Sequence, residues 1–266
     1  MVVIRTLPPP QGNIWYLAYG SNLSSSKFIK DRGIHPLDVA VVSVPGFTLA
    51  LESMGFPYRE PSFATIRAQD LQAAPKEREL LGTAYLVTPQ QYKRIISSEG
   101  GGIAYREDSM HAVPLPKLLD PDQKESFDGS DDKMLVRTLV TVVQRRPPPR
   151  PSQRYLNLII DGAAEADYPH EYQAYLQSLP FYKPAKQLYR RIGAALFLSI
   201  WVPIMSFMEM ITNFAISSGG DASGNAPPVV IWLVRTALSV MWLHHDYVHA
   251  PIWGRGDGLE ESGSRL

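Results

Sequence analysis

Glu99 has a residue type and a position in the sequence that suit proton transfer. It follows a segment predicted to be helical, residues 90–98, and precedes three glycines, residues 100–102. We therefore expect its carboxylate at a helix end, beside a loop that cannot shield it. One carboxylate can act as base and then as acid if partial burial raises its pKa. A glutamate at a helix end is otherwise a solvated surface charge, and the spacing alone leaves both interpretations open.

A turn of small residues, Gly20-Ser21-Asn22, is the second candidate for chemistry. It interrupts an apolar run, residues 14–19, that is typical of a short buried strand, and a polar segment with helical character follows. Such a break leaves backbone N–H groups free to bind an anion or a developing oxyanion. The alternative is an ordinary strand–turn–helix connection. Ser21 lies outside any glycine–x–serine–x–glycine pattern, so we do not expect a covalent nucleophile there.

Histidines near the end of the chain form a candidate metal site. His245 and His249 are four residues apart and could share a helix face, with His244 and Asp246 beside them. The zinc-protease arrangement needs a glutamate between the two histidines and a third ligand, and neither is present. We therefore expect hydrogen-bonded histidines at a polar helix end and no metal.

An opening motif of the chain resembles that of the γ-glutamylcyclotransferase family: Tyr16-Leu17-Ala18-Tyr19-Gly20-Ser21-Asn22-Leu23. Further segments resemble the family in the same order along the chain: Phe63-Ala64-Thr65-Ile66, Leu81-Gly82-Thr83-Ala84-Tyr85-Leu86-Val87, Ser98-Glu99-Gly100, Tyr105, Pro151-Ser152-Gln153-Arg154-Tyr155, Gly162-Ala163 and Leu179-Pro180. The resemblance extends over residues 14–190. The hydrophobic extension that follows is similar to that of fungal members, including those of gliotoxin-type pathways, which trim glutamyl groups from glutathione adducts.

The resemblance implies an enzyme that cleaves a γ-glutamyl amide by cyclisation, releasing 5-oxoproline and a free amine or amino acid. It gives Glu99 the role of catalytic base and acid. It implies substrate contacts from the opening loop and from one later tyrosine: Tyr19, Gly20, Ser21, Asn22, Leu23 and Tyr105. Tyr105 could equally be a half-buried aromatic of the barrel. The mechanism requires no metal and no organic cofactor, because the substrate amine is itself the nucleophile.

The family fold implied for residues 14–190 is α+β, a mixed β-barrel with flanking helices. β-Branched or alternating runs predict strands at residues 39–44, 47–51, 63–67, 80–87, 103–118 and 134–143. Thr88 is expected to cap the helix before Glu99, with Pro89 at its first position. We expect a loop at residues 52–62, because they mix glycine, two prolines and charge. A second loop is expected at residues 120–132.

Residues 191–266 are expected to form a hydrophobic helical extension and a polar tail. Its apolar runs, residues 192–216 and 229–243, are interrupted by Glu209 and Arg235. Polar side chains recur at helical spacing in the first run: Ser199, Ser206, Glu209, Asn213 and Ser217. A narrow polar stripe of this kind favours helices docked on each other or on the barrel. A membrane surface or a partner protein in contact with residues 192–250 is the alternative.

Charge and composition restrict the possible partners and location. The 26 basic residues balance the 26 acidic ones, which argues against nucleic-acid binding. The chain has no cysteine, and residues 1–13 lack a secretory signal, so we expect a cytoplasmic protein with membrane association open. The expected partner is a small γ-glutamyl compound. A non-catalytic or membrane-tethered scaffold with the same fold is the competing interpretation.

Overall fold

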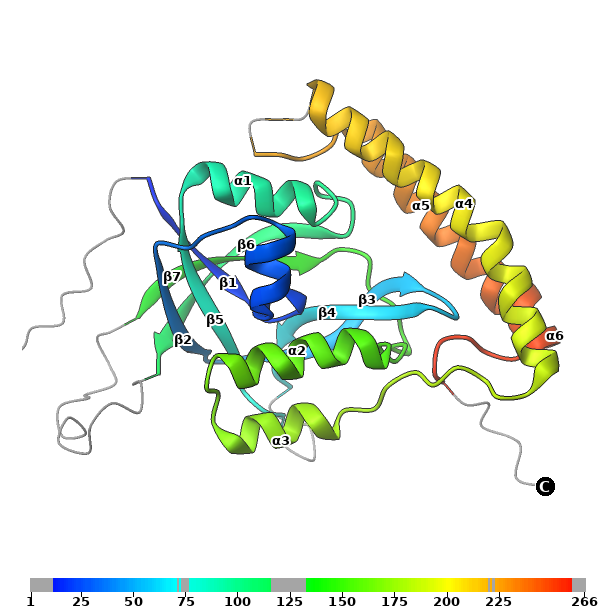
Figure 1. Ribbon diagram of the computed structural model, residues 1–266, viewed down its shortest axis with the longest axis horizontal. Helices are drawn as coiled ribbons and strands as arrows, with labels where there is room; N and C mark the ends of the chain where they lie inside the picture. The colour runs from blue at the N-terminus through cyan, green and yellow to red at the C-terminus, as the bar shows by residue number, and fades with distance from the viewer. Residues whose placement is uncertain are drawn as a thin grey trace, which may run out of the picture.

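Five strands close into a barrel in the order β1-β5-β2-β6-β7 (Figure 1). The computed structural model describes residues 12–70, 72, 77–115, 133–219, 221 and 223–259. The barrel strands are β1 (Ile14–Ala18), β2 (Asp38–Val44), β5 (Leu80–Val87), β6 (Tyr105–Pro114) and β7 (Met134–Thr141). All pairs are antiparallel except β1 with β7, which closes the barrel in parallel. The predicted mixed barrel is confirmed, and the loop expected at residues 120–132 lies outside the described residues.

Apolar side chains fill the barrel and the space under its helices. Leu17 and Val42 project from neighbouring parts of the sheet and are fully buried. Phe28, from the π-helix η2 (Ser26–Asp31), stacks on Tyr85 with ring centroids 4.2 Å apart. Burial of each such side chain contributes roughly 1.5–3 kcal/mol to folding. This core fixes the end of β1, and with it the turn that follows.

Helix α1 (Pro89–Ser98) carries Glu99 to the mouth of the barrel. The Thr88 side chain accepts a hydrogen bond from the Gln91 amide at 3.2 Å, and the Gln91 side chain accepts one from the Thr88 amide at 3.0 Å. This capping box confirms the expected helix start. Residues 100–102 all have positive φ, of 85°, 54° and 83°, which only glycine adopts readily in succession. The glycine run therefore ends the helix directly after Glu99.

The segment expected as a loop at residues 52–62 is instead the tip of a β-hairpin. β3 (Phe47–Phe56) and β4 (Glu60–Ala68) pair antiparallel as a separate two-stranded sheet. The prolines are tolerated because Pro57 lies in the turn and Pro61 in a strand with only one neighbour. Their presence made the local sequence resemble a loop, and the prediction was wrong.

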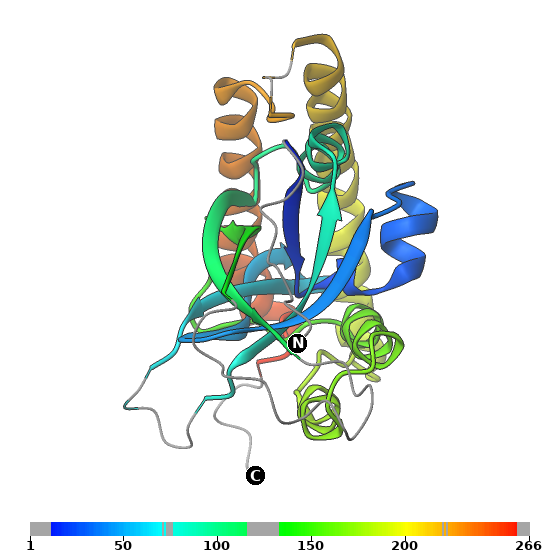
Figure 2. The same ribbon diagram turned by 90° about the vertical axis from the view of Figure 1, so that its left-hand side faces the viewer.

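Four longer helices complete the fold. They are α2 (Gln153–Glu165), α3 (His170–Ser178), α4 (Leu188–Gly219) and α5 (Pro228–His244). The short turns η4 (His245–His249) and α6 (Ala250–Trp253) follow α5, whereas η1 (Ser21–Leu23) directly follows β1. Figures 1 and 2 show α4 and α5 side by side along one flank of the barrel, with the β3–β4 hairpin reaching toward them.

The α4–α5 pair docks on the hairpin through its own apolar cluster. Tyr58 from the hairpin packs with Phe197 and Trp201 of α4 and with Met241 and Trp242 of α5. Arg235 adds polar links to the barrel, because its guanidinium donates to the carbonyls of Ile103 at 2.8 Å and Gly102 at 2.9 Å. The structure thus has the docked helices favoured by the polar stripe. By length and composition alone, α4 is also apolar enough to cross a membrane.

Candidate active site

The carboxylate of Glu99 lies against the opening turn, as the sequence predicted. Its Oε1 accepts a hydrogen bond from the side-chain amide of Asn22 at 2.9 Å. The guanidinium of Arg32 donates to the same oxygen at 2.6 Å. The exposed fractions of the two charged side chains are 21% for Glu99 and 14% for Arg32. The acid is thus held in a partly dry environment, with one opening left for a ligand.

Two opposing effects set the proton affinity of Glu99. Burial raises the pKa of its carboxyl because the charged form loses hydration. The positive charge of Arg32 and the hydrogen bond from Asn22 lower that pKa, but burial prevails and the pKa of Glu99 is raised. A carboxyl group of this kind can both release and accept a proton nearer neutral pH than an exposed glutamate.

Asn22 organises the turn and leaves one acceptor unused. Its Nδ2 donates to the hydroxyl of Tyr16 at 2.8 Å as well as to Glu99. Its Oδ1 is buried and has no hydrogen-bond partner among the described residues. An unpaired buried carbonyl is costly unless a ligand supplies a donor. Oδ1 of Asn22 is therefore suited to accept a hydrogen bond from a bound molecule.

Tyrosines line the rest of the cavity as neutral hydroxyl groups. The Tyr105 hydroxyl donates to the Ala64 carbonyl at 3.1 Å, and the Tyr155 hydroxyl accepts from the Ala64 amide at 3.0 Å. The Tyr19 hydroxyl donates to the carbonyl of Leu139. Burial raises the pKa of each of these tyrosines, so none ionises near neutral pH. The residues around the cavity are Tyr16, Tyr19, Gly20, Ser21, Asn22, Ala64, Glu99, Tyr105, Leu139 and Tyr155.

The backbone of the turn supplies donors to the same cavity. The amides of Leu23 and Ser24 donate to the carbonyls of Gly20 and Ser21, at 3.0 and 3.2 Å, which forms the 3₁₀ turn η1. The first amides of such a turn have no partner inside it. Those of residues 20–22 are therefore the candidates for holding an anionic oxygen.

The side chain of Leu23 lies apart from the cavity. Its side chain is 3% exposed and belongs to the main core, outside the group that surrounds the cavity. The reason is the close approach of α2, where a Cβ at Gly162 would lie 2.4 Å from the backbone carbon of Leu23. Leu23 therefore supports the turn from the core side, next to α2. The other predicted site residues, Tyr19, Gly20, Ser21, Asn22, Tyr105 and Glu99, do meet around one cavity.

Arg32 is the charged site residue that the sequence analysis did not identify. It lies in a polar segment and contacts an acid 67 positions away, so no local pattern marks it. Tyr16 and Tyr155 were also given no role, although both belong to segments that resemble the family. Their place in those segments was the available signal.

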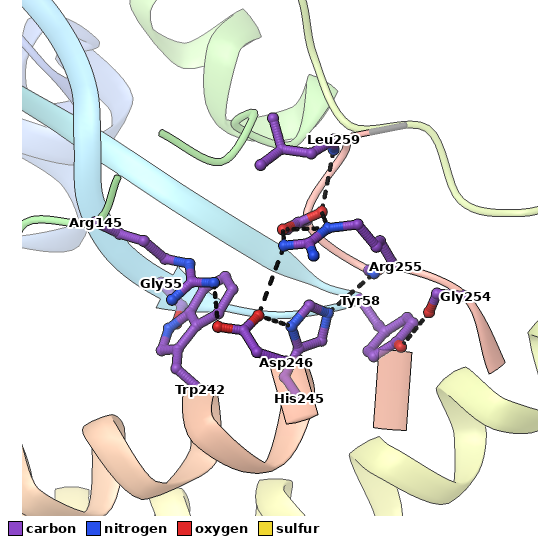
Figure 3. A network of polar contacts seen from close by, with 11 residues as sticks. Gly55, Tyr58, Arg145, Trp242, His245, Asp246, Gly254, Arg255 and Leu259 are labelled. Atoms are coloured by element: carbon purple, nitrogen blue, oxygen red, sulfur yellow. Dashed lines mark hydrogen bonds and ion pairs between the residues drawn. The ribbon is translucent and has the colours of Figure 1, made fainter. Parts of the chain in front are cut away.

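The C-terminal histidines are engaged in hydrogen bonds. His245 contacts Asp246 at 2.9 Å and accepts from the Gly256 amide at 3.1 Å (Figure 3). Arg145 and Arg255 both contact Asp246, so cations of the chain already neutralise this acid. His245, Asp246 and Asp257 are close enough to share an ion, but these arginine contacts make the cluster a link between α5, the barrel and the tail.

Relatives of known name match nearly the whole chain. Gamma-glutamyl cyclotransferase aclK of Aspergillus oryzae is 44% identical over 261 residues, which cover 95% of this chain and 93% of that protein. The chain belongs to the γ-glutamyl cyclotransferase family. Gamma-glutamyl cyclotransferase gliK of Aspergillus fumigatus is 38% identical over 263 residues, covering 95% of this chain and 92% of that protein. The protein named gliK in Claviceps purpurea is 33% identical over 236 residues, covering 89% and 100%.

The extension of this γ-glutamyl cyclotransferase family member has a match of its own. A family model described as the AclK C-terminal domain matches residues 187–252, which contain α4 and α5. The crystal structure of human uncharacterized protein loc79017 covers 66% of this chain and 94% of that chain, with a TM-score of 0.51 and 18% identity. The likeness to that structure shows a shared fold, and about a third of the present chain lies outside it.

Replacement of Arg32 by methionine is expected to raise the pKa of Glu99 further. The change removes the positive charge that stabilises the carboxylate while burial of the acid persists. Carbon-13 NMR titration of labelled glutamate carboxyls measures the shift. Arg106→Met is the matched control, because the Arg106 side chain is 66% exposed. This change should leave the pKa of Glu99 unchanged. An unchanged or lowered pKa of Glu99 in Arg32→Met would contradict this account of the site.

Proposed function

We propose that this chain is a γ-glutamyl cyclotransferase that converts a γ-glutamyl amide into 5-oxoproline and a free amine or amino acid. The observation that carries the proposal is the contact between Glu99, with its raised pKa, and the Asn22 turn. This pair provides a proton carrier beside the buried, unpaired Oδ1 of Asn22. The substrate amine supplies the nucleophile, so the reaction needs positioning and proton transfer more than covalent catalysis.

The glutamyl half of the substrate binds at the turn. Its α-ammonium group donates to Glu99 and to the unpaired Oδ1 of Asn22. The amides of residues 20–22 hold the γ-carbonyl oxygen, where negative charge develops during attack. The surrounding tyrosines limit the space available to the flexible glutamyl chain, which favours the folded conformation needed for ring closure.

Glu99 then moves two protons, one after the other, from the α-nitrogen of the substrate to the departing amine. Its carboxylate takes a proton from the α-ammonium, and the freed amine attacks the γ-carbonyl carbon to form the five-membered ring. The tetrahedral intermediate collapses with cleavage of the original carbon–nitrogen bond. The protonated Glu99 gives its proton to the departing amine, and the restored carboxylate takes the second proton from the ring nitrogen and passes it to the free amine, which leaves as an ammonium ion. These steps involve only the described side chains and the substrate.

The substrate class follows from the fungal relatives. We propose γ-glutamyl groups on glutathione-derived adducts of fungal secondary metabolism. A γ-glutamylamine would undergo the same chemistry, whereas glutathione-specific members usually have leucine where this chain has Asn22. We also propose that residues 14–190 form the catalytic unit and that residues 191–266 form the extension.

Glu99→Gln is expected to lower kcat/KM for 5-oxoproline release by about 10²–10⁴-fold, because the amide cannot carry the proton. The assay measures 5-oxoproline from a panel of γ-glutamyl compounds. In the wild-type protein, kcat/KM should rise with pH through the raised pKa of Glu99, because only the carboxylate acts as base.

Glu171→Gln, on the first turn of α3, is the matched control and retains wild-type activity. Equal activity of Glu99→Gln and wild type would overturn the mechanism. Absence of activity from every protein, with all of them folded, would favour the scaffold interpretation.

We further propose that the outer face of α4 and α5 rests on a cytoplasmic membrane surface. The two helices expose large apolar side chains: Phe207, Met210, Phe214, Trp232 and Leu243. Basic residues lie before and within the first turn of α4: Lys183, Lys186, Arg190 and Arg191. Apolar and basic groups together suit the interface of an anionic membrane. Ser206, Glu209 and Asn213 of α4 border the space between this helix and the barrel, which favours a surface position over a spanning one.

Flotation with vesicles of phosphatidylcholine and phosphatidylserine tests membrane contact. The wild-type protein should float, and Phe214→Glu should reduce the floating fraction by placing a charge on the outer face. Leu135→Glu makes the same kind of change at an exposed side chain of β7 and should float like wild type. A wild-type protein that stays in the soluble fraction would contradict the proposal.

A further inference from the structure

A large cleft continues outward from the Glu99 cavity, between the barrel and α4. Ser21, Glu99, Tyr105 and Tyr155 border both spaces, so the cavity opens directly into the cleft. The cleft has a volume of about 620 Å³. Sites that bind small organic ligands have volumes of about 300–1,000 Å³. The space is thus far larger than a glutamyl group needs.

The inner walls of the cleft are apolar. Met54, Phe56 and Phe63 of the hairpin form one wall, together with Leu158 of α2. Met205 faces them from α4 and is half-buried, with Val202 one turn before it. Three residues of the polar stripe of α4, Ser206, Glu209 and Asn213, border the same cleft.

Basic side chains surround the cleft on the barrel side. Lys27 pairs with Asp31 at 2.6 Å, and Arg154 pairs with Glu60 at 2.7 Å. Arg59 borders the cleft as well and makes no ion pair within the part of the chain that the structure describes. Its charge is therefore available to an anionic group of a bound molecule.

The two helices of the extension are fixed to the loop that follows Glu99. The amide of Ala226 donates to the Gly101 carbonyl at 2.9 Å, and Arg235 donates to the next two carbonyls. A Cβ at Gly101 would lie 2.6 Å from Ile216 of α4. The α4 wall is therefore held in a constant position relative to the catalytic carboxyl.

We propose that this cleft binds the amine half of the γ-glutamyl substrate and selects a bulky, largely apolar amine that carries an anionic group. Met205 of α4 and the hairpin hold the apolar part, and Arg59 holds the anionic part. The inference rests on the proposed function, because that function places the glutamyl half at the turn and directs the amine half past Tyr105 and Tyr155 into the cleft.

The test compares 5-oxoproline release from S-benzylglutathione, whose amine half is bulky, and from γ-glutamylalanine, whose amine half is small. The measured quantity is kcat/KM for S-benzylglutathione divided by kcat/KM for γ-glutamylalanine. Met205→Trp fills the cleft and should lower this ratio at least about tenfold. Met210→Trp makes the same change on the outer face of α4 and should keep the ratio within about twofold. Arg59→Gln should weaken turnover of S-benzylglutathione more than that of its C-terminal amide.

An unchanged ratio in folded, active Met205→Trp would overturn the proposal. If that variant does not fold, Ser206→Trp, at an exposed position bordering the same cleft, replaces it. If the wild-type protein releases no 5-oxoproline from any compound, the proposed function fails. In that case calorimetry measures the binding of the amine S-benzylcysteinylglycine and tests the cleft assignment separately. Binding to wild type that Met205→Trp abolishes would support the cleft assignment, and no binding would overturn it.

Discussion

The burial of one carboxyl group constrains the rest of this structure. Glu99 must be buried enough for its pKa to rise, so that it can hold a proton. It must also keep enough polar contact to release that proton. Burial against tyrosines provides the first condition, and Arg32 and Asn22 provide the second. Since one unit of pKa corresponds to about 1.4 kcal/mol, small changes in either contact change the protonation of the acid at a given pH. The capped helix and the glycine loop serve to place this side chain.

The barrel and the extension both border the space next to Glu99. The barrel supplies the turn and the acid, while α4 and α5 are attached to the loop behind that acid through Arg235 and Ala226. A helix pair in this position does more than cover apolar surface, because one of its faces borders the space that continues from the catalytic cavity. The matches to the relatives named aclK and gliK in Aspergillus cover 95% of this chain, so they include the extension.

The features predicted correctly from the sequence depend on neighbours along the chain. The cap at Thr88, the strand at residues 80–87 and the glycine stop after Glu99 are local signals, and the structure has all three. The hairpin at residues 52–62 was missed because pairing between β3 and β4 outweighs the local effect of two prolines. The burial of the Leu23 side chain in the core could not be predicted, because a motif does not say which of its side chains turn inward. Arg32 was missed because its partner is distant in sequence.

The central claim is that Glu99 exchanges a proton with the nitrogen that closes the ring. A crystal structure of the protein with bound 5-oxoproline tests it most directly. We expect the ring nitrogen within hydrogen-bond distance of the Glu99 carboxyl and an oxygen of the product on the amides of residues 20–22. A product bound with its ring nitrogen directed away from Glu99, while that carboxyl contacts only Asn22 and Arg32, would contradict the account.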